Sequence, residues 1–360
     1  MTLDDLRRTA VARSLFTPTT LQRALNALGF VQADPIRAPA RAQDLTLRHR
    51  VTGYRAGDLE RRYSRLDVHE DFFVNYGFVT GAVQALMHPR GGAAPWTAAR
   101  GRHVHALLDF ARTRGAVHPR EVDEHFSHGT VTNYWGGSSA ATTHLLDGMH
   151  YRGLLRVVRR EAGIRIYAPH EHAAGPRDAA TRRANLDALV DVIVRTYAPL
   201  PAASLSSLVR RLRLAVPQWA RDLERTLERA RRRLAHAHVA GAEWYWPADL
   251  ALADDAPHDV VRLLAPFDPV VWDRRRFEIL WGWAYRFEAY TPAPKRSLGY
   301  YALPLLWRDR VIGWGNVSVK NGTLQADLGY IASQPPRGRV FRQALEEELD
   351  RLGVFLGLES

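Results

Sequence analysis

The sequence predicts an α+β protein in which three tandem winged-helix (helix-turn-helix) units precede a small antiparallel β-barrel. Two observations carry this prediction. Short amphipathic helices followed by strand pairs recur over the first three-quarters of the chain, and aromatic and turn residues concentrate in the last quarter. With 360 residues, of which 46% are hydrophobic, the chain is long enough for several folded units. We expect four units, at residues 1–95, 96–175, 176–255 and 256–360.

The first unit begins with two short helices joined by a tight turn. Thr2 and Asp5 form the pattern of a helix N-cap with an acidic first turn. Leucines spaced i, i+4 and i+7 over residues 21–28 share one face of the second helix, and Gly29 stands where a helix-ending glycine belongs. The run Phe30–Pro35 that follows is typical of a short extended segment.

The second unit has the clearest pattern in the chain. One helix ends near Gly115, and Pro119 suits the first position of a second helix, Pro119–Phe126. A third helix is expected over 138–151 after a glycine- and serine-containing turn. Leu154–Arg159 and Ile164–Ala168 then indicate two strands around a turn. Three helices and a strand pair in this order are typical of a winged helix.

The third unit repeats the same order of elements without a repeat of residue identity. Arg182–Tyr197 is amphipathic, and two further helices are expected before residue 235. Val239–Trp246, around Gly241, indicates a small hairpin.

The last unit differs in composition, because aromatic residues gather between Trp272 and Trp314. Alternating residues and the Asn321-Gly322 turn indicate several antiparallel strands, and Val340–Leu352 indicates a closing helix. We expect most of these aromatic side chains in the core and few as stacking platforms.

The composition favours a polyanionic partner. The net charge is +12, and a pI above 9 on a chain of this size is typical of nucleic-acid binding. Only Lys295 and Lys320 are lysines among 50 basic residues. A GC-rich genome would explain this arginine preference, but it would not explain the net charge.

The sequence also excludes several classes of protein. The absence of cysteine excludes disulfides, thiolate nucleophiles, iron–sulfur clusters and cysteine-based zinc sites. No run of about 18 apolar residues is present, and the charged amphipathic N-terminus lacks the apolar core of a signal peptide. We therefore expect a cytoplasmic protein that makes no membrane contact.

We predict neither a metal site nor a cofactor. His103 with His105, and His125 with His128, have ligand-like spacings but lack a suitable acidic or cysteine partner. Gly136-Gly137 lacks the lysine and the spacing of a phosphate-binding loop.

Gln32 and Asp34 are the candidate catalytic residues. They stand two apart in an extended segment, so their side chains share one face. A carboxylate and an amide held side by side can bind and activate one water molecule. The alternative is a polar strand end that caps a neighbouring helix.

The residues around this pair resemble the AlkZ/YcaQ family of bacterial DNA glycosylases. The family signature is Gln-x-Gln in one branch and Gln-x-Asp in the YcaQ-like branch, which Gln32-Ala33-Asp34 matches. Residues 134–157 resemble the second winged helix of the family, and residues 263–306 resemble its barrel. The stretch 69–90 departs from the Trp-containing helix ending in Leu-Pro that the family pattern leads us to expect.

The resemblance implies hydrolysis of the N-glycosidic bond of N7-alkylated purines, including purines joined in interstrand crosslinks. Asp34 would act as general base and stabilise the oxocarbenium-like sugar, and Gln32 would orient the water. No lysine stands beside this motif, which argues against Schiff-base lyase chemistry and favours an abasic-site product. The expected partner is double-stranded DNA in the nucleoid, bound by a monomer, because no dimerisation helix is obvious.

Arginines and one lysine are the candidate DNA contacts. The residues 295–296 resemble the tip of a hairpin that family members press into a DNA groove, with an ordinary barrel hairpin as the alternative. Each of the other arginines could equally be a solvated or salt-bridged surface residue. The predicted set is Arg37, Arg41, Arg48, Arg50, Arg274, Arg275, Lys295 and Arg296.

Two other functions remain open from the sequence. A non-enzymatic winged-helix regulator would explain the charge and the helix-turn-helix pattern, but it would not need Gln32 and Asp34 on one face. A family member without activity could also bind damaged DNA as an architectural protein.

Overall fold

The computed structural model describes residues 1–91, 96–126, 129–132, 138–172, 175, 178–253 and 257–358. The chain divides into two compact units. The larger unit contains Met1–Leu59, Val190–Val209 and Leu227–Ser360, and the smaller unit contains Glu60–Leu189 and Arg210–Thr226.

The larger unit begins with the two predicted helices. Its first elements are α1 (Leu3–Ser14), α2 (Leu21–Leu28), β1 (Phe30–Gln32) and α3 (Ala42–Leu47), and α4 (Asp58–Arg62) leads into the smaller unit. The predicted N-cap is confirmed, because Thr2 and Asp5 form a reciprocal capping box. Gly29 ends α2 at φ +68°, which a side-chain-bearing residue adopts only at a cost.

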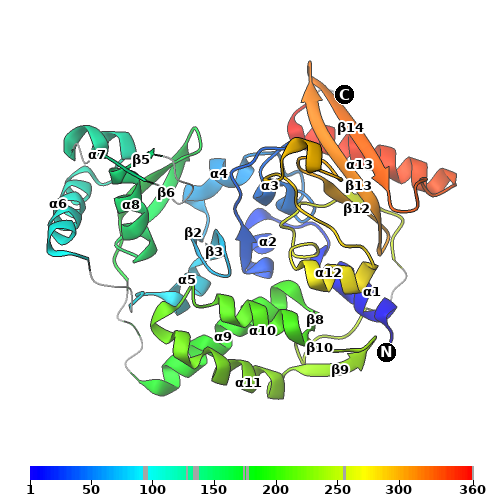
Figure 1. The fold of residues 1–360 in the computed structure, drawn as a ribbon, viewed down its shortest axis with the longest axis horizontal. Coiled ribbons are helices and arrows are strands. Elements are labelled where there is room, and N and C mark those ends of the chain that lie inside the picture. The colour runs from blue at the N-terminus through cyan, green and yellow to red at the C-terminus, as the bar shows by residue number, and fades with distance from the viewer. Residues whose placement is uncertain are drawn as a thin grey trace. The chain divides into compact units, whose positions relative to one another are not determined.

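An antiparallel sheet dominates the C-terminal part of the larger unit (Figure 1). Its strands are β11 (Val261–Leu263), β12 (Leu303–Trp307), β13 (Arg310–Lys320) and β14 (Thr323–Tyr330), in that order. The predicted Asn321-Gly322 turn is confirmed, with φ +51° and +75°. Helix α13 (Arg339–Leu356), coloured red in Figure 1, packs on β11. This order leaves β11 and β14 at the two edges of the described sheet, so a closed barrel is not confirmed.

A helix interrupts the aromatic region that the sequence analysis assigned to strands. Asp273 caps α12 (Arg274–Trp281) by accepting from the backbone N–H of Arg276 at 3.1 Å. The aromatic residues pack around this helix in one buried cluster, as expected for core residues. Its aromatic members are Phe277, Trp281, Trp283, Tyr285 and Trp314.

Residues 292–301 do not form the predicted hairpin. They contain the single 3₁₀ turn η3 (Ala293–Lys295), and regular strand structure resumes only at Leu303. Pro292 and Pro294 lack the N–H groups that a strand ladder needs, which explains the difference. Glu288 fixes this loop by accepting hydrogen bonds from the backbone N–H groups of Ser297, Leu298 and Gly299.

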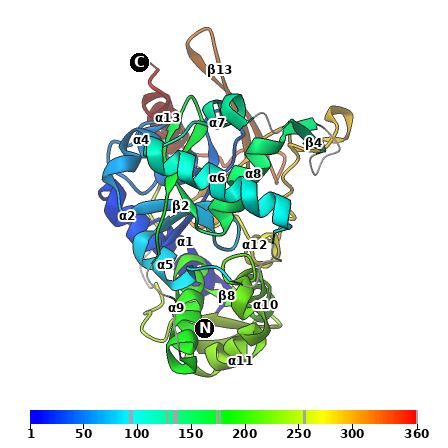
Figure 2. The ribbon, with the colours of Figure 1, turned by 90° about the vertical axis from the view of Figure 1, so that its left-hand side faces the viewer.

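In the smaller unit, three helices gather beside a strand pair (Figures 1 and 2). These elements are α6 (Ala98–Arg114), α7 (Pro119–Phe126), α8 (Ala141–Tyr151), β6 (Leu155–Glu161) and β7 (Ile164–Pro169). Their order is the predicted one. The third helix starts later than expected, because Ser138–Ala140 (β5) pairs with Thr130–Thr132 (β4).

A hairpin and a helix come before these elements in the smaller unit. The hairpin is β2 (Val68–Phe72) with β3 (Tyr76–Thr80), and the helix is α5 (Gly81–Met87). They lie in the stretch 69–90 that departs from the family pattern.

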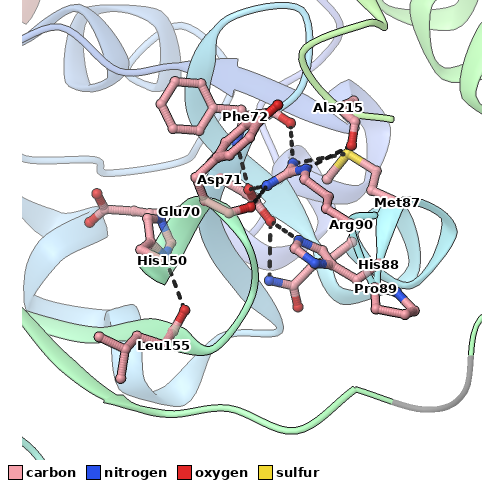
Figure 3. A network of polar contacts seen from close by, with 12 residues as sticks. Glu70, Asp71, Phe72, Met87, His88, Pro89, Arg90, His150, Leu155 and Ala215 are labelled. Atoms are coloured by element: carbon pink, nitrogen blue, oxygen red, sulfur yellow. Dashed lines mark hydrogen bonds and ion pairs between the residues drawn. The ribbon is translucent and has the colours of Figure 1, made fainter. Parts of the chain in front are cut away.

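The same stretch contributes a cluster of buried charged side chains (Figure 3). Asp71 accepts hydrogen bonds from Arg90 at 2.6 Å and from His88 at 2.8 Å. Arg90 also donates to the carbonyls of Phe72 and Ala215. Burial by itself would raise the pKa of Asp71, but Arg90 and the hydrogen bond from His88 hold it well below its ordinary value. The side chains of Asp71, His88 and Arg90 are buried and paired with one another, so the cluster has a structural role.

The remaining elements follow the order of helices and a hairpin that the sequence predicts for the third unit. They are α9 (Ala179–Tyr197), β8 (Leu200–Pro201), α10 (Ala202–Arg211), η2 (Pro217–Asp222), α11 (Leu223–Arg233), β9 (Ala235–Val239) and β10 (Ala242–Trp246). The predicted hairpin around Gly241 is confirmed, since β9 and β10 pair across Ala240 and Gly241 at φ +49° and +75°.

Several predicted features lie outside the described residues. They are Gly136-Gly137, His128 and the unit boundaries at residues 95, 176 and 255. Among the described residues, no helix combines the length and the apolar character needed to cross a membrane.

Candidate active site

Strand β1 and the turn after it carry the Gln-x-Asp pair. The strand ends at Gln32, before the end of the predicted extended run, and Asp34 lies two residues further on, in a turn closed by its own side chain. The backbone N–H of Ile36 donates to Asp34 Oδ1 at 2.9 Å, which closes this turn. Pro35 between them cannot extend a strand ladder, which explains why the strand stops early.

Gln32 is held by a residue that the sequence analysis did not select. The indole N–H of Trp272 donates to Gln32 Oε1 at 2.5 Å. Trp272 directly precedes the N-cap of α12, and its ring lies 5.5 Å from the ring of Tyr197. Since this bond uses the carbonyl side of the amide, it fixes the orientation of Gln32 and leaves its NH₂ group as a donor.

Asp34 is a buried carboxylate, with 8% of its surface exposed. Its backbone N–H donates to Gln43 Oε1 at 3.3 Å, and among the described residues no cation pairs with its side chain. Burial raises the pKa of Asp34, and the hydrogen bond from Ile36 offsets only part of this effect. Oδ2 accepts no hydrogen bond from any described residue, so one carboxylate oxygen remains available to a ligand.

A cleft of about 820 Å³ opens next to this turn. One wall is the segment Arg37–Pro39, which follows Asp34 closely in the chain, and the other wall comes from β13 and β14. Tyr300 and Tyr301 also line it. The charged side chains of its lining are Arg37, Lys320 and Asp327, so cations outnumber anions in the cleft.

Four of the predicted DNA contacts lie between Asp34 and Val51, and the side chains of three of them are held inside the unit. Arg37 is exposed, whereas Arg41 is buried. Arg48 pairs with the buried Glu348, and Arg50 forms two hydrogen bonds to Asp268, at 2.8 and 2.9 Å. Arg48 and Arg50 therefore have structural roles, and sequence proximity to Asp34 did not distinguish them from Arg37.

The three arginines of the run Asp273–Arg276 also differ from one another in burial. Arg274 is half-buried and lies over the ring of Tyr285 at 4.5 Å, and Arg275 is exposed. Arg276 is buried and donates to the backbone carbonyl of Pro199 at 2.8 Å. Burial lowers the pKa of Arg276 to about 10.

The loop that carries Lys295 and Arg296 is exposed at Lys295 and partly exposed at Arg296. Arg296 donates to the carbonyl of Thr291 at 2.8 Å and lies over the ring of Tyr300 at 5.0 Å. Tyr290 in the same loop is 72% exposed. Partial burial raises the pKa of Tyr290, and the negative charge of Asp34 raises it further. The loop therefore presents an aromatic group near the Asp34 carboxylate, and Lys295 and Arg296 belong to the same loop.

Sequence reasoning missed Trp272, Tyr290 and Tyr301. Their distance from Gln32 and Asp34 in the chain exceeds 200 residues, so no local pattern links them. The only signal was the concentration of aromatic residues around them.

Two comparisons with known proteins bear on the family and the fold of this chain. The sequence model of the AlkZ-like DNA glycosylase family matches residues 25–355. The fold is similar to the solved structure of Streptomyces sahachiroi DNA glycosylase AlkZ, with a TM-score of 0.64 and 13% identity over 99% of this chain and 97% of that chain. At this identity the structural match shows a shared fold, and the family match extends to function. The chain therefore belongs to the AlkZ-like DNA glycosylase family and is a DNA-binding hydrolase of DNA repair.

Proposed function

We propose that this DNA glycosylase is monofunctional and hydrolyses the N-glycosidic bond of N7-alkylated purines, including purines joined in interstrand crosslinks. The observation that carries the proposal is the pairing of an oriented amide with a buried carboxylate at the end of β1. Gln32 is fixed by Trp272, and Asp34 keeps Oδ2 available beside an open cleft. The pair Gln32 and Asp34 supports assigning the chain to the Gln-x-Asp branch of the family.

In the proposed reaction, Asp34 takes a proton from a water molecule as the water oxygen bonds to C1′ of the sugar. The C1′–N9 bond breaks, and its electron pair moves into the cationic purine, which leaves as a neutral base. The products are an abasic site, the free alkylated base and one proton. The negative charge of Asp34 also stabilises the oxocarbenium character that develops on the sugar.

Gln32 orients the water in this mechanism. Because its Oε1 already accepts from Trp272, its NH₂ group is the side that donates to the water oxygen. One lone pair of the water then points to C1′, and one hydrogen points to Asp34. An amide fixed in this way needs no reorganisation during the reaction.

A general base without a general-acid partner is sufficient for a cationic leaving group. N7-alkylguanine already carries a positive charge, so no general acid is needed to protonate it. Asp34 is a suitable base, because burial raises its pKa and so makes it more basic than an ordinary aspartate.

We further propose that residues 1–95, 96–175 and 176–255 are three winged-helix units of a monomer that acts on the nucleoid. The order α6, α7, α8, β6, β7 supports this for the second unit. Among the predicted DNA contacts, the exposure of three favours them as phosphate contacts: Arg37, Arg275 and Lys295, with Arg296 beside them.

Base release from defined duplexes tests the proposal. One duplex carries a single N7-methylguanine, one carries a nitrogen-mustard crosslink between two guanines, and one is unmodified. We expect wild-type protein to produce alkali-labile sites in the first two and none in the third, without strand cleavage before alkali. Asp34→Asn is expected to lower the rate by about 10²–10⁴-fold, the usual contribution of a general base, and Gln32→Ala also lowers it.

The controls separate the enzyme from its rivals. Binding of each duplex is measured for every variant, so that rates are compared at equal occupancy. Tight binding without base release from either modified duplex would favour the regulator or the architectural protein. Wild-type base release by Asp34→Asn would contradict the proposed mechanism.

A further inference from the structure

The hydroxyl of Tyr301 is a polar group that the proposed mechanism leaves unused. Tyr301 lies just before β12, and 3% of its surface is exposed. Its hydroxyl is buried and has no hydrogen-bond partner among the described residues. A buried hydroxyl without a partner is costly, so such a group in a folded protein calls for an explanation.

The neighbouring buried tyrosine shows that this position is unusual. Tyr285 is equally buried, and its hydroxyl donates to the carbonyl of Ala302 at 2.7 Å. The two tyrosines are alike in burial, but the hydroxyl of Tyr285 is satisfied inside the protein and the hydroxyl of Tyr301 is not.

Tyr301 is also well placed to reach the active site. The edge of its ring packs on Phe287, with centroids 5.3 Å apart and planes at 86°, which holds the ring. It lines the cleft together with Arg37 and Pro39, the residues that follow Asp34. The charged and titratable groups facing it are Asp34, Tyr285, Tyr290 and Arg274.

The chemistry of the two side chains is complementary. Burial raises the pKa of Tyr301, and the negative charge of Asp34 raises it further, so the hydroxyl keeps its proton and acts as a donor. Asp34 has an acceptor oxygen, Oδ2, that no described residue uses. No hydrogen bond joins Tyr301 to Asp34 in the protein without DNA, and catalytic hydrogen bonds commonly tighten only in the substrate complex.

We propose that Tyr301 is a positioning residue for Asp34, whose hydroxyl donates to Oδ2 of the carboxylate once DNA occupies the cleft. The backbone N–H of Ile36 holds Oδ1, so the two donors fix the plane of the carboxylate. Oδ2 still has a second lone pair for the proton of the water. A hydrogen bond to the charged form also keeps Asp34 ionised when DNA excludes solvent. This inference rests on the proposed function of Asp34.

The test compares Tyr301→Phe with Tyr285→Phe, which remove the same atom from neighbouring rings. The readout is the single-turnover rate of N7-methylguanine release, measured from pH 5 to 8 at saturating enzyme. For Tyr301→Phe we expect the acid limb of the pH–rate profile to move to higher pH by about one unit. DNA affinity should change by less than about twofold. Thermal stability should rise or stay equal, because an unsatisfied buried hydroxyl is removed. Tyr285→Phe should lose stability and keep the wild-type acid limb.

A double variant makes the test independent of folding. If Tyr301 acts through Asp34, then Tyr301→Phe added to Asp34→Asn should change the remaining rate by less than about twofold. An unchanged acid limb in Tyr301→Phe would overturn the inference, and so would an additive loss in the double variant. If Asp34→Asn itself keeps the wild-type rate, the proposed function fails. If Asp34→Asn is inactive and Tyr301→Phe keeps the wild-type acid limb, the inference about Tyr301 fails while the proposed function stands.

Discussion

Among the described residues, one hydrogen bond orients the Gln32 amide, and its donor stands 240 residues later in the chain. Without Trp272, the carbonyl and NH₂ ends of the amide would be free to exchange places. Only one of the two orientations presents a donor to the water. In the proposed mechanism, Trp272 therefore selects the productive orientation of Gln32, and no motif in the sequence encodes this contact.

Replacing Trp272 tests this role. Trp272→Phe keeps an aromatic ring and removes the indole N–H, so we expect the single-turnover rate of base release to fall by about tenfold or more. DNA affinity should change little, because Trp272 makes no proposed DNA contact. Electrophoretic mobility shifts and single-turnover assays measure the two effects separately.

Trp281 offers a matched control for this substitution. Its indole N–H donates to the carbonyl of Asp309 at 2.9 Å within the same unit. Trp281→Phe should therefore lower stability and leave the rate unchanged. An equal loss of rate in both variants would show that Trp272 acts only through packing.

At the scale of elements, buried charges connect segments that the hydrophobic pattern alone would not fix. In the larger unit, Arg50 joins α1 and α3 to Asp268 through hydrogen bonds to Ser14, Thr46 and the carboxylate. In the smaller unit, Asp71 joins β2 to the segment after α5 through His88 and Arg90 (Figure 3). Both clusters use arginines that a reading of net charge would assign to DNA.

The smaller-unit cluster makes a stability prediction. Arg90→Ala leaves the buried Asp71 carboxylate without its main cation, so we expect a loss of about 3–5 kcal/mol. Hydrogen exchange of the β2 and β3 amides measures this loss directly within the unit. Arg112→Ala, which breaks an exposed pair with Asp109 on α6, is the control, and it should cost about 0–1 kcal/mol. Similar losses in both variants would contradict the structural role of the cluster.

At the scale of the whole molecule, the sequence predicted the local elements more fully than their grouping. Helix starts and hairpin turns follow from capping residues and glycines, so Thr2, Gly241 and Gly322 mark element boundaries correctly. The interruption of the aromatic region by α12 was not predicted, because its aromatic residues suit a strand and a packed helix equally.

The active site was predictable only in part. Gln32 and Asp34 were found because they are close in sequence and match a family motif. Trp272 and Tyr301 reach them only through the packing of the larger unit, which local patterns do not specify. The burial of the arginines was equally hard to predict. Arg37 and Arg50 have similar sequence contexts, but Arg37 is exposed and Arg50 is buried.

The pH dependence of wild-type base release is the most direct test of the account, because it reports the protonation of Asp34 itself. Burial raises the pKa of Asp34 above its ordinary value of 3.8, so the carboxylate is protonated and inactive at low pH. The single-turnover rate, corrected for spontaneous depurination, should rise through a limb above that value and become level near neutral pH.

Asp34→Asn should show no limb and a rate lower by about 10²–10⁴-fold at pH 7. It should be at least as stable as wild type at neutral pH, because a carboxylate whose pKa is raised by folding destabilises the fold wherever it is ionised. That advantage should disappear as pH falls through the folded-state pKa. A limb that persists in Asp34→Asn, or a wild-type rate in that variant, would contradict the assignment of Asp34 as the base.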